Sequence, residues 1–209
     1  MQRWLIALAI GVCMVLFAAS GALGAEVYVE YLPNGTWEIN DWVDGDASAT
    51  IIGLEFPIEK WKLGFEFATG DLDAPNGGNF TDIKAYEFKG GYQVVSKENV
   101  KVDLTASYLK FDNDDFDTNA DGVLLGADAS FQLASKVSLD GSIGYSISGN
   151  TEFYGYDVDA TLWRGKVKLN YDFTKNLTGA IGYRYYNIEN DYDDEFELRG
   201  WFAGVSYKF

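Results

Sequence analysis

Charged residues recur at every second position in the run Arg164-Gly-Lys166-Val-Lys168. In an extended strand, alternate side chains share one face, so these three bases should lie together. Arg184 and several acids hold equivalent positions in other runs, and we expect them on the same face. The acids are Glu66, Glu87, Asp128 and Asp140. Such a lumen charge network is either an ion-paired plug, which we favour, or the constriction of a pore.

Calcium binding is a second candidate chemistry, in the run Asp117-Thr-Asn119-Ala-Asp121-Gly122. Oxygen-bearing residues at alternate positions match the opening half of a calcium-binding loop. Position twelve of that pattern is Asp128, where a glutamate is required, and it falls inside an expected strand. Asp117, Asn119 and Asp121 are therefore weak metal candidates, and we expect no other cofactor.

Composition excludes several classes of function. The chain has no histidine and one cysteine, Cys13, which falls in a segment that we expect to be removed. Relays of histidine or cysteine nucleophiles and zinc sites are therefore excluded from the mature chain. The formal net charge of −16 argues against nucleic acid as a partner, because phosphate binding needs clustered Lys and Arg.

The N-terminal segment is typical of a secretory signal. A basic residue, Arg3, precedes an apolar run from Trp4 to Ala19, and small residues follow at Ala22 and Gly24. The run is shorter than the roughly 20 residues that a membrane-spanning helix needs. We expect a signal peptide over residues 1–24 and one domain over residues 25–209.

From Ala25 onward, apolar and polar residues alternate, as in the run from Val137 to Ile147. This period of two predicts strands, and turn-type residues separate the runs. The predicted strands start near Ala25, Thr50, Trp61, Ile83, Val100, Val123, Val137, Asp157, Leu177 and Leu198. The fold class is therefore all-β, with about ten strands and eight as the alternative. Asn34-Gly35 either closes an extra short hairpin or bulges the first strand.

Connections between these strands alternate in length. The short ones are 57–60, 96–99, 134–136 and 174–176, and the longer ones are 32–47, 70–82, 112–121, 149–156 and 189–197. Acidic residues concentrate in the longer set, above all in 112–121 and 189–197. The plainest interpretation is a solvated surface that resists aggregation. The sharper alternatives are a field that attracts cations and divalent-ion bridging to lipopolysaccharide phosphates.

The apolar face of the predicted strands carries no charge, which suits contact with lipid. Its aromatic residues fall at two levels near the strand ends, as the interfacial girdles of a membrane barrel do. Phe56, Trp61, Tyr92, Phe131, Phe173 and Tyr207 lie near the short connections. Tyr31, Phe67, Tyr86, Tyr108, Tyr145, Trp163, Tyr185 and Trp201 lie near the longer ones. These patterns predict a closed antiparallel up-and-down transmembrane β-barrel.

The final run supplies a resemblance. Phe209 ends the chain, and Trp201, Ala203, Val205 and Tyr207 hold the alternate upstream positions. This run resembles the last strand of small bacterial outer-membrane β-barrel proteins. In those proteins, a similar C-terminal pattern is the signal that the barrel assembly machinery reads. The resemblance implies the outer membrane as location, short periplasmic turns and longer extracellular loops. It also implies outer-membrane lipids and the assembly machinery as partners.

The resemblance implies that an enzyme among such barrels, a protease, a phospholipase or a lipid-A modifying enzyme, would use an active-site histidine. The chain has none, so we expect no enzyme. The leading interpretation is a structural or surface-interaction protein with acidic extracellular loops and divalent cations as candidate loop ligands. The alternative is a narrow, cation-preferring, porin-like channel for small solutes. Ten strands favour a filled interior, because barrels of about eight strands are packed with side chains and aqueous channels are typical of sixteen or more.

Overall fold

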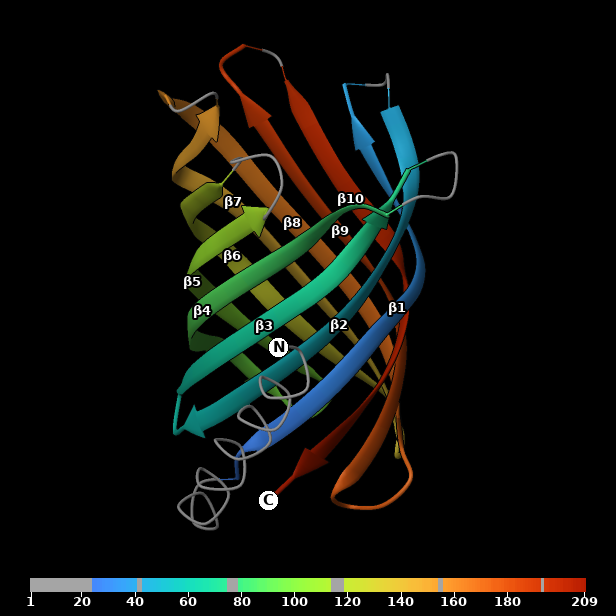
Figure 1. Cartoon of the computed structure of the whole chain (residues 1–209). Coiled ribbons are helices and arrows are strands. Elements are labelled where there is room, and N and C mark those ends of the chain that lie inside the picture. Colours follow the sequence, from blue (N-terminus) through green and yellow to red (C-terminus); the bar gives the residue numbers. More distant parts are fainter. Residues whose placement is uncertain (1–23, 41–42, 75–78, 114–118, 154–155, 193) are drawn as a thin grey trace.

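The computed structural model describes residues 24–40, 43–74, 79–113, 119–153, 156–192 and 194–209, which form one closed barrel (Figure 1). Residues 1–23 of the expected signal peptide and Asp117 lie outside the described residues. The strands are β1 (Glu26–Ile39), β2 (Val43–Ile58), β3 (Trp61–Asp73), β4 (Asn79–Lys97), β5 (Val100–Asn113), β6 (Ala120–Ala134), β7 (Val137–Phe153), β8 (Tyr156–Asp172), β9 (Leu177–Asn190) and β10 (Glu195–Lys208).

Each strand pairs antiparallel with its neighbours in sequence, and β1 pairs with β10 to close the barrel. The prediction of ten strands is confirmed, and the alternative of eight is wrong. Four strands begin at the predicted residue: Trp61, Val100, Val137 and Leu177. All four follow the short turns, and we call this the short-turn end of the barrel (Figure 1).

At the opposite end, the hairpin end, strands continue into the segments expected to be loops. β1 runs to Ile39 and β2 starts at Val43, so most of segment 32–47 is paired. β4 likewise starts at Asn79, before the predicted Ile83. The sequence analysis ended these strands too early, because the alternation of apolar and polar residues weakens there. Paired strand ends extend to this end of the barrel (Figure 1).

Asn34 belongs to a β-bulge and closes no extra hairpin. The pairing of β1 shifts between Tyr31 and Asn34 against β10, and between Leu32 and Gly35 against β2. A bulge adds one residue to a strand and changes which later residues face inward. Tyr31 is 50% exposed on the outer wall, whereas Trp37 is fully buried in the lumen.

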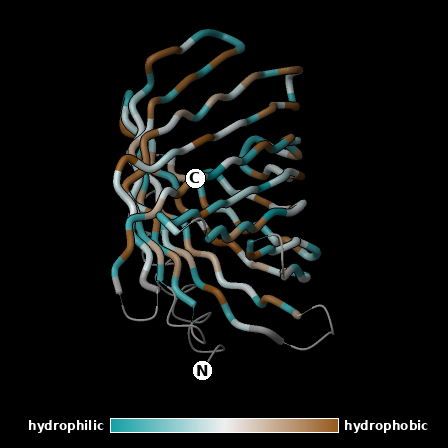
Figure 2. Tube along the Cα trace, turned by 90° about the horizontal axis from the view of Figure 1, so that it is seen from above, coloured by the Kyte–Doolittle hydropathy of each residue, from teal (hydrophilic) through white to brown (hydrophobic). Residues whose placement is uncertain are grey.

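The outer wall carries the apolar face, as expected. Leu104, Ile143 and Val205 are each more than half exposed, at 57%, 57% and 54%. Hydrophobic and hydrophilic residues alternate along the strands in Figure 2. Aromatic pairs lie at both levels, with ring centroids 4.9 Å apart for Trp61 and Tyr92 and 4.3 Å apart for Trp163 and Tyr185. In the part of the chain that the structure describes, no helix is long and apolar enough to cross a membrane.

Two glycines allow close packing where the barrel closes. Gly35 and Gly200 are paired across β1 and β10, and a Cβ on Gly200 would lie 2.7 Å from the Cα of Gly35. We expect Gly200→Ala to lower the free energy of unfolding by about 1–3 kcal/mol, because the backbone must shift. The matched control is Gly90→Ala on the outer wall, where the nearest atom to a new Cβ is 4.0 Å away. Equal losses in urea unfolding would contradict this packing argument.

Candidate functional site in the barrel lumen

Arg184 forms the centre of a layer of ion pairs across the lumen. It projects from β9, and its side chain is 4% exposed. Its Nε donates to Glu30 of β1 at 2.9 Å, and its two terminal nitrogens donate to both oxygens of Glu66 on β3, at 2.6 and 2.9 Å. Paired donors matched to a carboxylate give a well-defined geometry. Arg184 therefore ties one side of the barrel to the other.

Two further bases of β8 complete this layer, which we call the ion-pair layer. Arg164 lies 2.7 Å from Glu87 of β4 and donates to the Ser142 hydroxyl at 2.6 Å. Lys166 lies 3.5 Å from Glu30 and 3.9 Å from Glu66. The three bases and their three acids balance in charge, so no net charge is buried at this depth. Removing a single member would leave a partner uncompensated.

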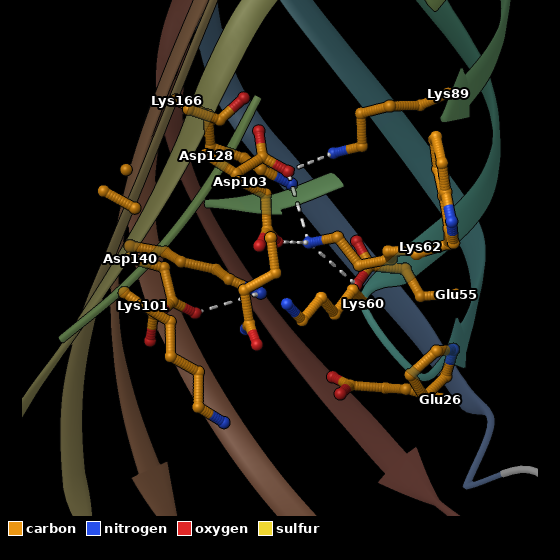
Figure 3. Close-up of a pocket in the computed structure, with 18 of the residues that line it drawn as sticks. Glu26, Glu55, Lys60, Lys62, Lys89, Lys101, Asp103, Asp128, Asp140 and Lys166 are labelled. Carbon is orange, nitrogen blue, oxygen red and sulfur yellow. Dashed lines mark hydrogen bonds and ion pairs between the residues drawn. The ribbon is translucent and has the colours of Figure 1, made fainter. Parts of the chain in front are cut away.

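A second group of charges lies between the ion-pair layer and the short-turn end. Lys62 of β3 lies 3.3 Å from both Asp103 and Asp128, which face each other on β5 and β6. Lys89 of β4 donates to Asp128 at 2.9 Å. Figure 3 shows the two lysines reaching toward these carboxylates. Like charges opposite one another on neighbouring strands are unfavourable, and the lysines offset that repulsion.

A cavity of about 310 Å³ lies beside this second group of charges. We call it the vestibule, and its lining includes Glu26, Lys60, Lys62, Gln93, Lys101 and Lys168. Lys60 belongs to the β2–β3 turn and Lys101 lies near the start of β5, so the vestibule reaches the short-turn end. Charged side chains project into it from several strands (Figure 3). The ion-pair layer lies at its inner limit.

The hairpin half of the lumen is filled by apolar side chains, which we call the apolar layer. It contains three clusters, the first of which reaches back to the ion-pair layer through Tyr28 and Phe202: Tyr28, Leu32, Ala49, Ile51 and Phe202; Ala85, Leu109, Phe111, Ala120, Leu124, Leu162 and Ile188; and Trp37, Ala47, Leu72, Ile83 and Leu198. Trp37 and Leu162 are fully buried, and Trp37 donates its ring N–H to the Asp73 carbonyl at 2.9 Å. A cavity of only about 30 Å³ remains here. An apolar region this tight excludes a column of water.

All eight residues assigned to the lumen charge network face inward. The structure brings together Arg184 with Glu66, and Arg164 with Glu87. Lys168 lies 3.8 Å from Asp140, its cross-strand partner. Asp128 belongs to the separate lysine group described above, and Asp140 also accepts a hydrogen bond from Asn170 at 2.7 Å.

Sequence analysis missed the inward aromatic residues. The Tyr28 ring covers Gly53 and the Phe202 ring covers Gly182, so rings fill the space beside these two inward-facing glycines. The Tyr28 hydroxyl also donates to Glu66 at 2.7 Å, so this ring supports the ion-pair layer. The signal was present in the alternation, because Tyr28 and Phe202 each flank an outward-facing residue of their strand.

The weak metal candidates do not form a site among the described residues. Asp121 accepts a hydrogen bond from the Tyr108 hydroxyl at 3.1 Å, and the backbone carbonyl of Asn119 accepts one from Thr151 at 3.2 Å. No group of three or more ligating side chains is found over the described ranges. Asp117 lies outside them.

The residues of the expected assembly signal lie on the outer wall of β10. Trp201, Val205 and Tyr207 are 67%, 54% and 45% exposed. The rings of Tyr207 and Phe209 are 4.8 Å apart, and the Phe209 amide donates to the Ala25 carbonyl at 2.9 Å. The terminal residue is therefore fixed against the start of the barrel.

Carboxylates gather on the outer wall of the hairpin end, beyond the aromatic girdle. Asp46 pairs in register with Asp73 across β2 and β3, and Asp71 pairs with Asp82 across β3 and β4. Asp71 lies four residues past Phe67 of the predicted girdle, outside the part of β3 that we expect to span the membrane. Partial burial and the opposing Asp82 raise the pKa of Asp71, because both disfavour its charged form.

This raised pKa predicts a pH-dependent effect of Asp71→Asn. Ionising Asp71 costs more in the folded chain than in the unfolded one, so its contribution to stability falls as pH rises through the Asp range. We expect the substitution to increase the free energy of unfolding by less than about 1 kcal/mol at neutral pH and to give no gain below about pH 3. Urea unfolding at the two pH values measures this. The control is Asp112→Asn, which removes the carboxylate 2.7 Å from the Lys110 ammonium and should give no gain in stability. An equal gain for Asp71→Asn at both pH values, or any gain in the control, would contradict the prediction.

Comparisons with known proteins agree on the architecture. A family model described as outer membrane protein beta-barrel domain matches residues 5–209. The chain is similar to the outer membrane protease OmpT from Escherichia coli, with 12% identity, a TM-score of 0.61, and coverage of 89% of this chain and 97% of that one. No curated protein sequence matches the chain.

Two further solved structures share the fold. One is an outer membrane channel from Pseudomonas putida F1, with 13% identity, a TM-score of 0.56, and coverage of 90% of this chain and 96% of that one. The other is the β-domain of the Bordetella autotransporter BrkA, with 12% identity, a TM-score of 0.55, and coverage of 90% and 100%. Because the three neighbours differ in what they do, likeness at this identity shows the fold alone.

Proposed function

Because the chain belongs to the outer membrane protein beta-barrel domain family, and so lies in the bacterial outer membrane, we propose that it is a structural, surface-interacting barrel with a closed lumen. Its short-turn end faces the periplasm, and its acidic hairpin end faces the outside of the cell. A signal peptide directs its export, and the Trp201–Phe209 strand engages the barrel assembly machinery.

The single observation that carries this proposal is the double closure of the lumen. The ion-pair layer spans the barrel, from β8 and β9 to β1, β3 and β4. The apolar layer fills the hairpin half, where Trp37, Leu72, Leu124 and Leu162 are at most 1% exposed. A solute would have to displace both layers, and the two resist displacement for different physical reasons.

With the lumen closed, the acidic surface of the hairpin end is the part of the barrel that can bind other molecules. Asp46, Asp71, Asp73 and Asp82 lie close together there, and Glu197 accepts a hydrogen bond from the Tyr185 hydroxyl at 2.6 Å. Divalent cations and basic partners are the chemistry that such a surface attracts. Catalysis is not part of the proposal, because the chain has no histidine and the carboxylates of the ion-pair layer are matched by bases.

The alternative is a narrow, cation-preferring channel. The observation in its favour is the vestibule, which reaches the short-turn end and has a volume of about 310 Å³. Conduction would require the ion-pair layer and the apolar layer to move aside together.

Thiol labelling in intact cells tests the proposed orientation. In a Cys13→Ser background, which removes the chain's one native thiol, Tyr192→Cys places a thiol at a site that is 70% exposed in the β9–β10 connection. Lys136→Cys places one in the β6–β7 turn, at the short-turn end. A bulky, membrane-impermeant maleimide should label the Tyr192→Cys variant in intact cells and the Lys136→Cys variant only after the outer membrane is permeabilised. The reverse pattern would overturn the orientation.

A further inference from the structure

Some charged side chains that line the vestibule have ion-pair or hydrogen-bond partners, and others have none. Lys62 lies within 3.7 Å of Glu55 and within 3.3 Å of Asp103 and Asp128. Asp140 is held by Lys168 and Asn170. Glu26 lies 3.7 Å from Lys208. The carboxylates deep in the vestibule and the one on β1 therefore have partners within the barrel.

Lys60 and Lys101 differ from these groups. Among the residues that the structure describes, neither ammonium group has an ion-pair or hydrogen-bond partner. The turn that carries Lys60 is fixed, because its carbonyl accepts a hydrogen bond from the Gln93 amide at 2.8 Å. Figure 3 shows the Lys60 side chain extending into the vestibule and Lys101 lying beside its opening. The Gln93 side chain lines the same cavity and supplies a further N–H donor.

From this arrangement we infer that the mouth of the vestibule binds small dianions, such as inorganic phosphate or a short dicarboxylate, presented from the short-turn end. One ammonium group from the β2–β3 turn, one from β5 and one amide give a doubly charged oxyanion several donors at once. The paired carboxylates nearby keep their own lysines. Glu59, which neighbours Lys60 and also lines the vestibule, forms no ion pair with Lys60 or Lys101 in the described structure. The closed inner limit makes the vestibule a dead end, so the dianion binds and does not cross.

Delivery from the periplasm rests on the orientation proposed above, but binding itself does not. In detergent micelles both ends of the barrel are accessible, so binding can be measured whichever way the protein sits in the cell. A barrel that binds phosphate at this mouth and yet labels in the reverse orientation would refute the orientation alone.

Isothermal titration of the full barrel with inorganic phosphate, and separately with succinate, at low ionic strength tests the inference. We expect saturable binding of one dianion, weakened by added salt. The double variant Lys60→Gln and Lys101→Gln should bind roughly tenfold or more weakly, since each lost charged donor is worth a substantial part of that factor. The matched control is Lys136→Gln with Lys175→Gln, two turn lysines outside the vestibule lining, and it should bind as the parent does.

Urea unfolding of each variant checks that the barrel is intact. We expect the parent's stability in both double variants, because the substituted lysines make no ion pairs in the described structure. Absence of saturable binding by the parent protein would overturn the inference. Equal weakening in both double variants would also overturn it, because the effect would then reflect net charge and not this site.

Discussion

Arg184→Ala is expected to lower the free energy of unfolding by about 3–5 kcal/mol, the range found when one partner of a buried ion pair is removed. Glu30 is 2% exposed, and Arg184 supplies its closest ion-pair partner. Glu66 would lose both of its hydrogen bonds from the guanidinium. Lys166 would remain, at 3.5 and 3.9 Å, as a weaker counter-charge for the same two carboxylates. Urea unfolding of the refolded protein in lipid vesicles, followed by tryptophan fluorescence, measures the loss.

The matched control for this prediction is Arg199→Ala. Arg199 also forms ion pairs, with Glu38 and Glu197, but its side chain is 41% exposed. Exposed ion pairs contribute about 0–1 kcal/mol, so the control should lose little. Adding Glu66→Gln to Arg184→Ala should restore part of the stability by removing an uncompensated charge. Equal losses for the two arginines would contradict the role given to the ion-pair layer.

Leu104→Arg is expected to lower the free energy of unfolding by about 2–4 kcal/mol in a bilayer, as a charge on the lipid-facing wall at mid-depth does. Leu104 is 57% exposed on the uncharged outer wall, four residues after the start of β5 at Val100 and four before Tyr108 of the girdle. Because an exposed leucine makes few internal contacts, the loss arises from transferring the guanidinium into hydrocarbon. The same unfolding assay in vesicles measures it.

Tyr192→Arg is the matched control, since Tyr192 is 70% exposed but belongs to the hairpin end, outside the membrane. We expect its effect to stay within about 0.5 kcal/mol, as for ordinary surface substitutions. Similar losses at both positions would show that depth in the membrane is not what distinguishes them. The assignment of the outer wall to lipid would then fail.

The fold could be predicted from the sequence because the alternation of residues and the positions of the turns indicate the same strands. Uncharged apolar residues at alternate positions define the lipid face, and tight turns fix strand starts such as Trp61, Val100 and Val137. Beyond the girdle the same rule lost power. Trp37 and Leu72 face inward there, while Asp46 and Asp73 face water, and a bulge reverses the alternation in β1. The strand ends were therefore placed too early.

The inward charges could also be read from alternation, but their partners could not. Arg164 meets Glu87 across the lumen because β8 and β4 lie on opposite sides of the ten-strand barrel. That distance depends on strand tilt and register, which a period of two does not encode. The apolar layer was missed for a related reason: Leu124 and Leu162 look like ordinary strand residues until the closed barrel brings them together.

Single-channel recording in a planar bilayer tests the closed lumen most directly. The refolded mature barrel is inserted from a preparation whose folded fraction is known, and current is recorded under a salt gradient at moderate voltage. The structure predicts no steady conductance steps, because the ion-pair layer and the apolar layer both block the lumen. Stable, cation-selective steps of uniform size would contradict the account and establish the channel in its place.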